Sequence, residues 1–419
     1  MKHREERTES CGRLARRAAR LALAAALSFC LVTLSGCAST KRGEAVPFDL
    51  SVEAHVADFP SGLRYFTRDA IDVDEFQSDF LKSLEREKAY LKLDVLPPAS
   101  YLAISGGGDD GAFGAGILNG WTKTGTRPTF KIVTGVSTGA LIAPFAFLGP
   151  AYDESLKNLY TGISFADVAK ERSLLAVLYN DAVADNDPLQ KLVKKHVTAE
   201  MLEAIAVEHE RGRILLIATT NLDVRRPVVW NVTEIAATRL PGALDLVHKI
   251  LIASSAIPGT FPPVMIDVEA RGKRYQEMHV DGGTAAQLFV YPSAVKLHEV
   301  AARDRTLYLI RNARLDPEWA QVDRRTLSIA FRAITCLIHN QGIGDLYRIY
   351  SIAQRDRIRF RLTYIPRSFQ VVHPEQFDTA YMRELYALGE GMASNGLEWV
   401  DHPPVLLSGV SADSPEDPQ

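Results

Sequence analysis

The sequence predicts a layered α/β fold with a largely parallel central sheet. Two observations support this prediction: short apolar segments typical of strands alternate with longer segments typical of helices, and turn residues separate them. Strands that are separated by helices favour a parallel sheet, because a parallel connection needs a crossover. The chain has 419 residues, 47% of them hydrophobic and 24% charged, so it can bury a large core as globular proteins do.

The expected elements follow one another through the body of the chain. A stretch over 72–93 has the pattern of an amphipathic helix, and two prolines at 97–98 then break the chain. The strands that we expect cover residues 101–105, 130–134, 214–219, 228–232, 275–280, 306–311 and 360–364. The helices that we expect cover residues 112–121, 140–148, 243–255, 325–339 and 380–394.

The N-terminus has the features of a bacterial lipoprotein signal. Residues 2–20 are rich in Lys and Arg, and residues 21–34 form an apolar run without charge. That run is shorter than the roughly 20 residues needed to span a bilayer, and it matches the apolar core of a signal peptide. It ends in Leu34-Ser35-Gly36-Cys37, which resembles a lipobox. We therefore expect cleavage before Cys37 and lipidation of its thiol, while an ordinary signal peptide that contains a cysteine is the alternative.

Charge and cysteine content narrow the class of function. The formal net charge is −3, and residues 1–36 contribute +4, so the rest of the chain carries −7. This acidic body argues against nucleic acid as a partner, since phosphate binding needs a basic surface. After cleavage, Cys336 is the one thiol left besides Cys37, so we expect neither an internal disulfide nor a metal site of the CxxC type. Its apolar neighbours predict that Cys336 is buried.

The segment Gly135-Val136-Ser137-Thr138-Gly139 fits the pattern G-x-S-x-G. It lies between an expected strand and an expected helix, where a tight turn exposes the serine hydroxyl at the edge of a sheet. Gly135 and Gly139 leave room for that turn. Ser137 is therefore a candidate nucleophile.

A second glycine-rich segment, Gly106-Gly107-Gly108-Asp109-Asp110-Gly111, follows the strand expected at 101–105. Successive glycines let backbone N–H groups point at one spot, which suits a phosphate or an oxyanion. The segment also fits the dinucleotide pattern G-x-G-x-x-G. That alternative lacks the acidic residue expected after the second strand, so we favour an oxyanion hole.

Two further segments complete the set. Asp281, followed by Gly282 and Gly283, ends an expected strand, and a buried carboxylate there could act as the base for a serine. Residues 253–263, with the sequence ASSAIPGTFPP, read physically as a helix that prolines end.

These four segments, in this order, resemble the patatin-like phospholipase family over residues 101–289. The resemblance implies a three-layer α/β fold and a dyad in which Ser137 attacks an ester and Asp281 takes its proton. It also implies that the N–H groups of Gly106, Gly107 and Gly108 stabilise the oxyanion, and that no cofactor or metal takes part. Members of this family often carry Arg or Lys at the position where this chain has Asp110. The resemblance therefore does not extend to the rate or the substrate preference.

The predicted protein is a serine lipid acyl hydrolase that cleaves carboxylic esters of membrane phospholipids or other lipids. Lipidated Cys37 would anchor it in the bacterial cell envelope, with the outer membrane facing the periplasm as the expected place. A short-chain esterase or thioesterase, and a non-catalytic lipid-binding lipoprotein, are the alternatives. A Ser-Asp-His triad would need a histidine from His298, His339, His373 or His402, and a structural role is the better interpretation of each.

The expected segments of the chain are five in number. They are a signal peptide (1–36), a tether with an N-terminal helical segment (37–98), a patatin-like catalytic domain (99–320), a C-terminal helical extension packed on the core (321–405) and a flexible tail (406–419).

Overall fold

The computed structural model describes residues 42–66, 70–171, 181–300 and 302–404. The expected signal peptide, Cys37 and the tail at 406–419 lie outside these residues.

A ten-stranded sheet forms the centre of the described chain, in the order β1-β9-β10-β7-β4-β3-β11-β12, with β8 pairing to β7 and β2 to β8. Five neighbouring strands are parallel: β3 (Ala99–Ile104), β4 (Phe130–Val136), β7 (Ile214–Asn221), β11 (Arg305–Arg311) and β12 (Arg359–Tyr364). The antiparallel strands are β1 (His55–Val56), β2 (Arg64–Phe66), β8 (Arg226–Asn231), β9 (Val264–Ala270) and β10 (Lys273–Asp281). The α/β fold with a parallel centre is confirmed, and the antiparallel strands lie beyond β7.

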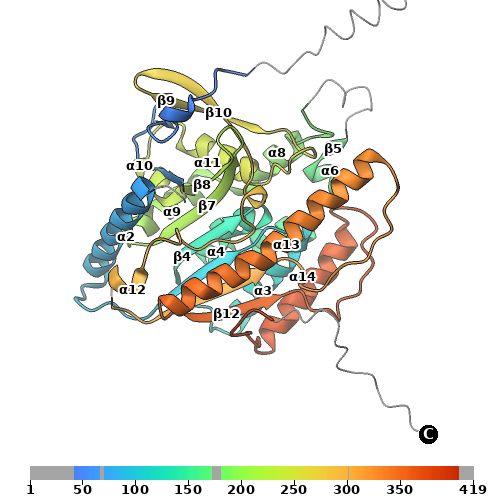
Figure 1. The fold of residues 1–419 in the computed structure, drawn as a ribbon. Helices are drawn as coiled ribbons and strands as arrows, with labels where there is room; N and C mark the ends of the chain where they lie inside the picture. The colour runs from blue at the N-terminus through green and yellow to red at the C-terminus, as the bar shows by residue number, and fades with distance from the viewer. Residues whose placement is uncertain (1–41, 67–69, 172–180, 301, 405–419) are drawn as a thin grey trace, which may run out of the picture. The chain divides into compact units, whose positions relative to one another are not determined.

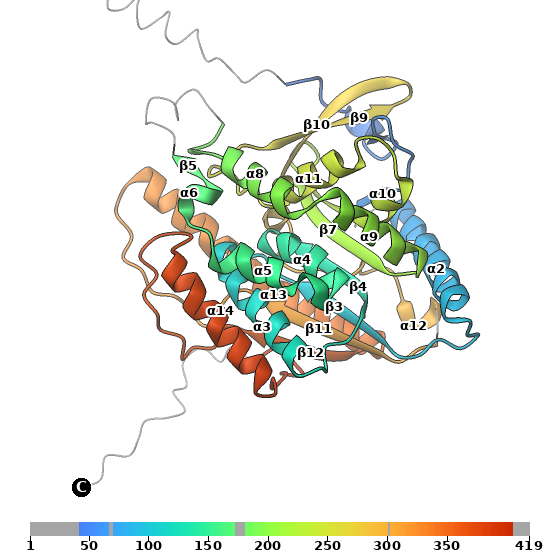
Figure 2. The same ribbon diagram turned by 180° about the vertical axis from the view of Figure 1, so that it is seen from behind.

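Helices cover both faces of this sheet, because its central strands are apolar on both sides. In β3, Leu102 and Ile104 face one cluster of buried residues, while Tyr101 and Ala103 face the other. The first cluster includes side chains from α3 (Gly111–Lys123), α4 (Thr138–Leu148), α5 (Asp153–Thr161), α8 (Asp187–His196), α9 (Ala199–Glu210), α10 (Val232–Thr238), α11 (Ala243–Ser254) and α14 (Thr379–Ser394). The second includes side chains from α2 (Ala70–Leu91), α12 (Leu297–Val300) and α13 (Thr326–Arg355). Figures 1 and 2 show these two helical layers from opposite sides.

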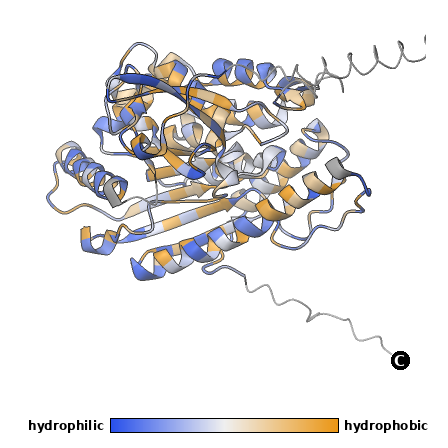
Figure 3. Ribbon diagram, turned by 45° about the horizontal axis from the view of Figure 1, so that its top comes forward, coloured by the Kyte–Doolittle hydropathy of each residue, from blue (hydrophilic) through white to orange (hydrophobic). Residues whose placement is uncertain are grey.

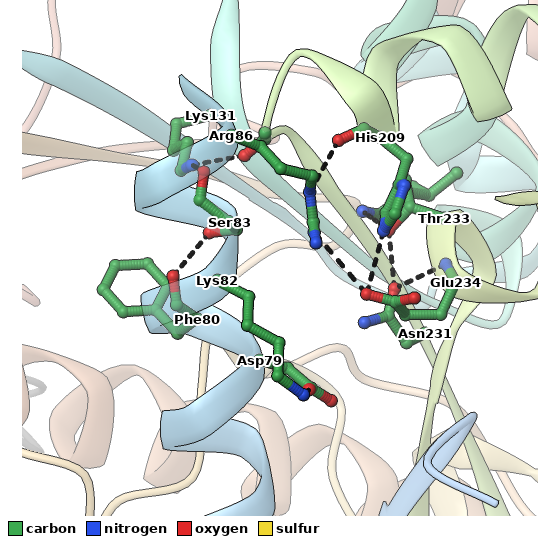
Figure 4. A network of polar contacts seen from close by, with 12 residues as sticks. Asp79, Phe80, Lys82, Ser83, Arg86, Lys131, His209, Asn231, Thr233 and Glu234 are labelled. Carbon is green, nitrogen blue, oxygen red and sulfur yellow. Dashed lines mark hydrogen bonds and ion pairs between the residues drawn. The ribbon is translucent and has the colours of Figure 1, made fainter. Parts of the chain in front are cut away.

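Polar contacts fix α2 to the edge of the sheet where β4 begins (Figure 4). Lys131, the second residue of β4, donates to the carbonyl of Ser83 at 3.2 Å and pairs with Glu87 at 2.9 Å. Arg86 donates through Nε to the carbonyl of His209 at 3.0 Å. Burial lowers the pKa of Lys131 to about 8, and the charge of Glu87 acts against that shift. These contacts hold the start of β4, whose other end leads into Ser137.

The helix α13 has two halves that differ in their surroundings. Leu346, Ile349 and Ala353 are buried in the cluster on one face of the sheet. Of the side chains described between 328 and 341, none is buried. Cys336 lies in this half and is exposed, so the prediction that it is buried is wrong. An apolar sequence is typical of a buried helix, but no other element of the described chain covers this one.

Candidate active site

Ser137 occupies a strained turn between β4 and α4. Its φ of 54° and ψ of −123° lie where residues with a side chain rarely occur. The glycines on either side are required by close backbone contacts. A Cβ on Gly135 would lie 2.3 Å from the carbonyl oxygen of Gly139, and a Cβ on Gly139 would lie 2.3 Å from that of Ile104. The turn expected from G-x-S-x-G therefore has a physical basis in this chain.

Sheet register brings Asp281 next to this serine. Asp281 ends β10 opposite Thr219 of β7, while Val136, the residue before Ser137, pairs with Ala218 of the same strand. The hydroxyl of Ser137 donates to Oδ2 of Asp281 at 2.6 Å. The other carboxylate oxygen, Oδ1, accepts the N–H of Gly283 at 2.6 Å. The two residues proposed as a dyad thus lie within hydrogen-bonding distance.

The Asp281 carboxyl is shielded from water, with 5% of the residue exposed. Burial raises its pKa to about 7, although the hydrogen bonds from Ser137 and Gly283 act to lower it. A base with a pKa near neutrality can accept a proton from the serine as the bond to substrate forms and return it later.

The segment 253–263 supports both members of the pair. Ser254 Oγ accepts the N–H of Ser137 at 2.9 Å and donates to the carbonyl of Ala218 at 2.7 Å. The carbonyl of Ala256 accepts the N–H of Asp281 at 2.9 Å. Sequence reasoning placed a proline-terminated helix here and assigned it no role. The one signal that could have pointed to Ser254 was the family resemblance of this segment, which begins Ala253-Ser254-Ser255-Ala256-Ile257-Pro258.

The glycine loop lies beside the serine. A Cβ on Gly106 would be 3.2 Å from Cβ of Ser137, and a Cβ on Gly107 would be 2.0 Å from the carbonyl oxygen of Asn312. The N–H of Gly106 donates to the carbonyl of Gln287 at 3.3 Å, so this group has a partner within the protein. Within the described ranges, the N–H groups of Gly107 and Gly108 have none. The oxyanion role predicted for the loop therefore rests on Gly107 and Gly108.

Two aspartates of this loop are held by the C-terminal part of the chain. Asp109 accepts Nε2–H of His373 at 2.7 Å and the N–H of Phe377 at 2.6 Å. Asp110 accepts the hydroxyl of Tyr381, in α14, at 2.7 Å. Burial raises the pKa of Asp110 to about 7, and the Tyr381 bond acts to lower it. Gly111, which begins α3, allows close contact with α4, because a Cβ there would lie 2.2 Å from Oγ1 of Thr138.

An apolar cavity opens next to Ser137 and Gly108. Its wall comes from several elements, including α5, α6 (Phe165–Val168) and α8, and among its lining residues are Leu141, Leu159, Val168, Leu189, Phe261 and Phe377. Such a wall suits a hydrocarbon chain, and none of the described residues that line it carries a charged side chain.

The histidines considered for a triad are engaged elsewhere or stand apart. His298 bonds Asp356, His373 bonds Asp109, and His402 bonds Asp401. In the part of the chain that the structure describes, no histidine forms a hydrogen bond with Ser137 or Asp281. His279, two residues before Asp281, is buried between Thr219 and Glu277. Among the same residues, no group of three or more His, Cys, Asp or Glu side chains is arranged to hold a metal ion.

Comparison with known proteins finds one family model that matches part of the chain. A family model described as patatin-like phospholipase matches residues 102–292, which include Ser137, Asp281, Ser254 and the glycine loop. No curated protein matches the chain.

Solved structures with a similar fold have low sequence identity to this chain. They include VipD from Legionella pneumophila (13% identity, TM-score 0.38, 73% of this chain and 68% of that one). ExoU, a type III effector protein of Pseudomonas aeruginosa, has 12% identity and a TM-score of 0.34, covering 72% of this chain and 53% of its own. The human GIVD cytosolic phospholipase A2 has 13% identity and a TM-score of 0.31, covering 68% and 51%. The chain thus spans about half the length of the last two.

Proposed function

We propose that this protein is a lipid acyl hydrolase that cleaves carboxylic esters of membrane lipids. Residues 102–292 match the model of the patatin-like phospholipase family, whose members are serine hydrolases that act on ester bonds. The observation that carries the proposal is the 2.6 Å hydrogen bond from Ser137 to a buried Asp281, beside an apolar cavity.

In the proposed mechanism, the Oγ of Ser137 attacks the ester carbonyl while Asp281 takes the serine proton. The negative charge that forms on the carbonyl oxygen is stabilised by the free N–H groups of Gly107 and Gly108. Collapse of the tetrahedral intermediate breaks the ester bond, and protonated Asp281 gives its proton to the leaving alcohol. Asp281 then takes a proton from water, which attacks the acyl-serine. As this second intermediate collapses, Asp281 returns the proton to Oγ of Ser137 and the fatty acid is released.

The positive end of a helix adds to this stabilisation. The helix α4 begins at Thr138, directly after the nucleophile, so its first N–H groups lie beside the serine. The N–H of Ser137 itself is bound to Ser254. We therefore assign that N–H to holding the turn and not to the oxyanion.

The apolar cavity favours a lipid over a short soluble ester as the substrate. An acyl chain that enters it removes apolar surface from water, at roughly 0.8 kcal/mol per buried methylene group. A longer chain is therefore expected to bind more tightly until the cavity is filled. A short-chain esterase or thioesterase would not show this dependence.

We also propose that the protein works at a membrane from a lipid anchor on Cys37. The basic leader, the apolar run and the lipobox support this part of the proposal. In residues 42–404, apart from the undescribed gaps, no helix is long and apolar enough to cross a membrane. The expected place is the outer membrane, on its periplasmic side.

The test is hydrolysis of phospholipid vesicles and of a series of esters with increasing chain length. Ser137→Ala should abolish release of fatty acid, while Ser351→Ala, an exposed serine of α13, should retain it. Full activity of Ser137→Ala would refute the proposed nucleophile. Hydrolysis of short soluble esters alone would instead identify a general esterase. A folded wild-type protein that binds lipid without cleaving any ester would be a lipid-binding protein.

A further inference from the structure

The N-terminal half of α13 exposes apolar side chains that soluble proteins normally bury. Leu337 is 70% exposed, Ile329 is 53% exposed and Ile334 is 36% exposed. Trp319, which precedes the helix, is 88% exposed. We call these four residues the apolar rim. Figure 3 shows hydrophobic colours concentrated in this half of the helix and hydrophilic colours toward its other end.

A hydrogen bond joins the two parts of the rim. Arg332, in α13, donates through Nη2 to the carbonyl of Glu318 at 2.5 Å, so the segment that carries Trp319 lies against the helix. A helix of a globular protein usually buries one face. Here the described side chains from 328 to 341 are exposed or half-buried all round, so the rim is an unpartnered surface within the described chain.

The rim continues from the part of α13 that packs beside the glycine loop. Where α13 reaches the core, Asp345 accepts the N–H of Gln287 at 2.6 Å, and the carbonyl of Gln287 accepts the N–H of Gly106. Gly342 lies against the side chain of Arg311, the last residue of β11, at the edge of the sheet where β4 ends in the nucleophile turn. Residues 326–341 precede this junction, and at 1.5 Å per residue they project about 24 Å beyond it. Figure 1 shows this part of α13 extending past the sheet.

Charge indicates what could cover the rim. Between Asp323 and Asp345 the chain contains no Asp or Glu, but it contains Arg324, Arg325 and Arg332. An apolar helix with basic residues and a nearby Trp has the composition of a helix that lies in the interface of an anionic bilayer. A second copy of the chain fits less well, since a two-fold contact through the rim would bring these cationic segments together.

We propose that the apolar rim is the surface through which this protein lies on an anionic lipid bilayer, with the glycine loop and Ser137 beside the headgroups. The inference rests on the proposed function, because it names the surface that would deliver a lipid ester to that site. The rim would enter the interface and would not span it, since its apolar part is shorter than the roughly 20 residues that spanning requires.

Binding can be measured apart from hydrolysis. The full chain would carry Ser137→Ala, so that vesicles stay intact, and Cys37→Ser, so that no acyl anchor contributes. Vesicles of phosphatidylglycerol and phosphatidylethanolamine would be compared with vesicles of phosphatidylcholine by flotation. Ile329→Asp together with Leu337→Asp should weaken binding to the anionic vesicles at least tenfold. The matched control is Val95→Asp, an 82% exposed apolar residue before β3 at the opposite edge of the sheet, and it should bind as the parent does.

Trp319 gives a direct optical signal. Trp121 and Trp230 are buried, and the half-buried Trp399 packs against Trp121 and Tyr308. A blue shift of emission on adding anionic vesicles should therefore come from the exposed Trp319 and should vanish in Trp319→Phe. Equal binding of the rim variant and its parent, or an unchanged Trp319 emission, would overturn the proposal. A dimer that the rim substitutions dissociate, without vesicle binding by the parent, would also overturn it and identify a second copy as the occupant.

Failure of this proposal is separable from failure of the proposed function. With Ser137 restored, the rim variant should hydrolyse a soluble ester at the wild-type rate, which also shows that it is folded. If the chain binds vesicles through the rim but cleaves no ester, the proposed membrane surface is supported and the proposed hydrolase function is refuted. If the rim variant cleaves vesicle lipid as fast as the wild type, the hydrolase function is supported and the proposed membrane surface is refuted.

Discussion

Ser254 holds the backbone of Ser137: its Oγ accepts the N–H of Ser137 at 2.9 Å and donates to the carbonyl of Ala218 at 2.7 Å. Ser254 is fully buried. One hydroxyl thus links the end of α11, strand β7 and the nucleophile turn. Because Ser137 has a strained backbone conformation, a fixed partner for its N–H helps to keep the hydroxyl aimed at Asp281.

Replacing Ser254 with Ala should leave this buried N–H without a partner. We expect the free energy of unfolding to fall by about 1–3 kcal/mol, and kcat to fall more than KM rises. Ser255→Ala is the stability control, because the hydroxyl of Ser255 is buried without a hydrogen-bond partner among the described residues. Denaturant titration of both variants checks this, and equal stability of Ser254→Ala and the wild type would contradict the role of Ser254.

Hydrolysis should depend on ionisation of Asp281. The carboxylate must be charged to take the serine proton, and burial raises its pKa to about 7. The value of kcat/KM should therefore rise with pH through about 7 and fall roughly tenfold per pH unit well below it. The profile should be measured in Asp110→Asn as well, since the pKa of Asp110 is also raised to about 7. An acid limb that disappears in that variant would assign it to Asp110 and not to Asp281.

Burial of the ionised Asp281 carboxylate should lower the free energy of unfolding. Its pKa is higher in the folded protein than the ordinary 3.8, so the folded state holds the proton more tightly and stability falls as pH rises from about 4 to about 7. The difference corresponds to about 4 kcal/mol above pH 7. Asp281→Asn, which cannot ionise, should therefore unfold at higher denaturant concentration than the wild type at pH 8. The two proteins should differ less at pH 4, and a constant difference at both pH values would contradict the assignment.

Asp110 should slow the reaction when it is ionised. Its charge lies in the loop that is expected to receive the oxyanion, and Tyr381 is its hydrogen-bond donor. Asp110→Asn should raise kcat about three- to tenfold at pH 9, which corresponds to about 1 kcal/mol of the barrier, and should have little effect at pH 6. Asp94→Asn, at an exposed position before β3, is the control. A rate loss at pH 9 would mean that the Asp110 charge assists the reaction.

Much of the sheet could be predicted from the sequence because its signals are local. The apolar runs of the parallel strands and the glycines around them predicted the strands at 101–105, 130–134 and 306–311, each within two residues of its observed bounds. Strand β9 was missed, although Arg271 and Gly272, both with positive φ, form the hairpin turn to β10. The charged residues Asp267 and Glu269 alternate with its apolar residues, so the sequence of β9 has no continuous apolar run.

Contacts between distant segments could not be predicted. The bond between Ser137 and Ser254 joins residues 117 positions apart, and Tyr381 reaches Asp110 across 271 positions. Nothing in the sequence around Ser254 or Tyr381 indicates that these side chains bond residues so far away in the chain. The apolar first half of α13 misled the prediction for the opposite reason, because apolar sequence shows what a helix could bury and not whether a neighbour is present to cover it.

The most direct test of the dyad is labelling with a fluorophosphonate probe, followed by mapping of the modified peptide. The probe reacts with a serine whose proton a nearby base accepts, so wild-type protein should be labelled at Ser137. Asp281→Asn should react at least 100-fold more slowly, with its fold checked by thermal unfolding. Labelling of Asp281→Asn at the wild-type rate, or of the wild type at another serine, would contradict the account.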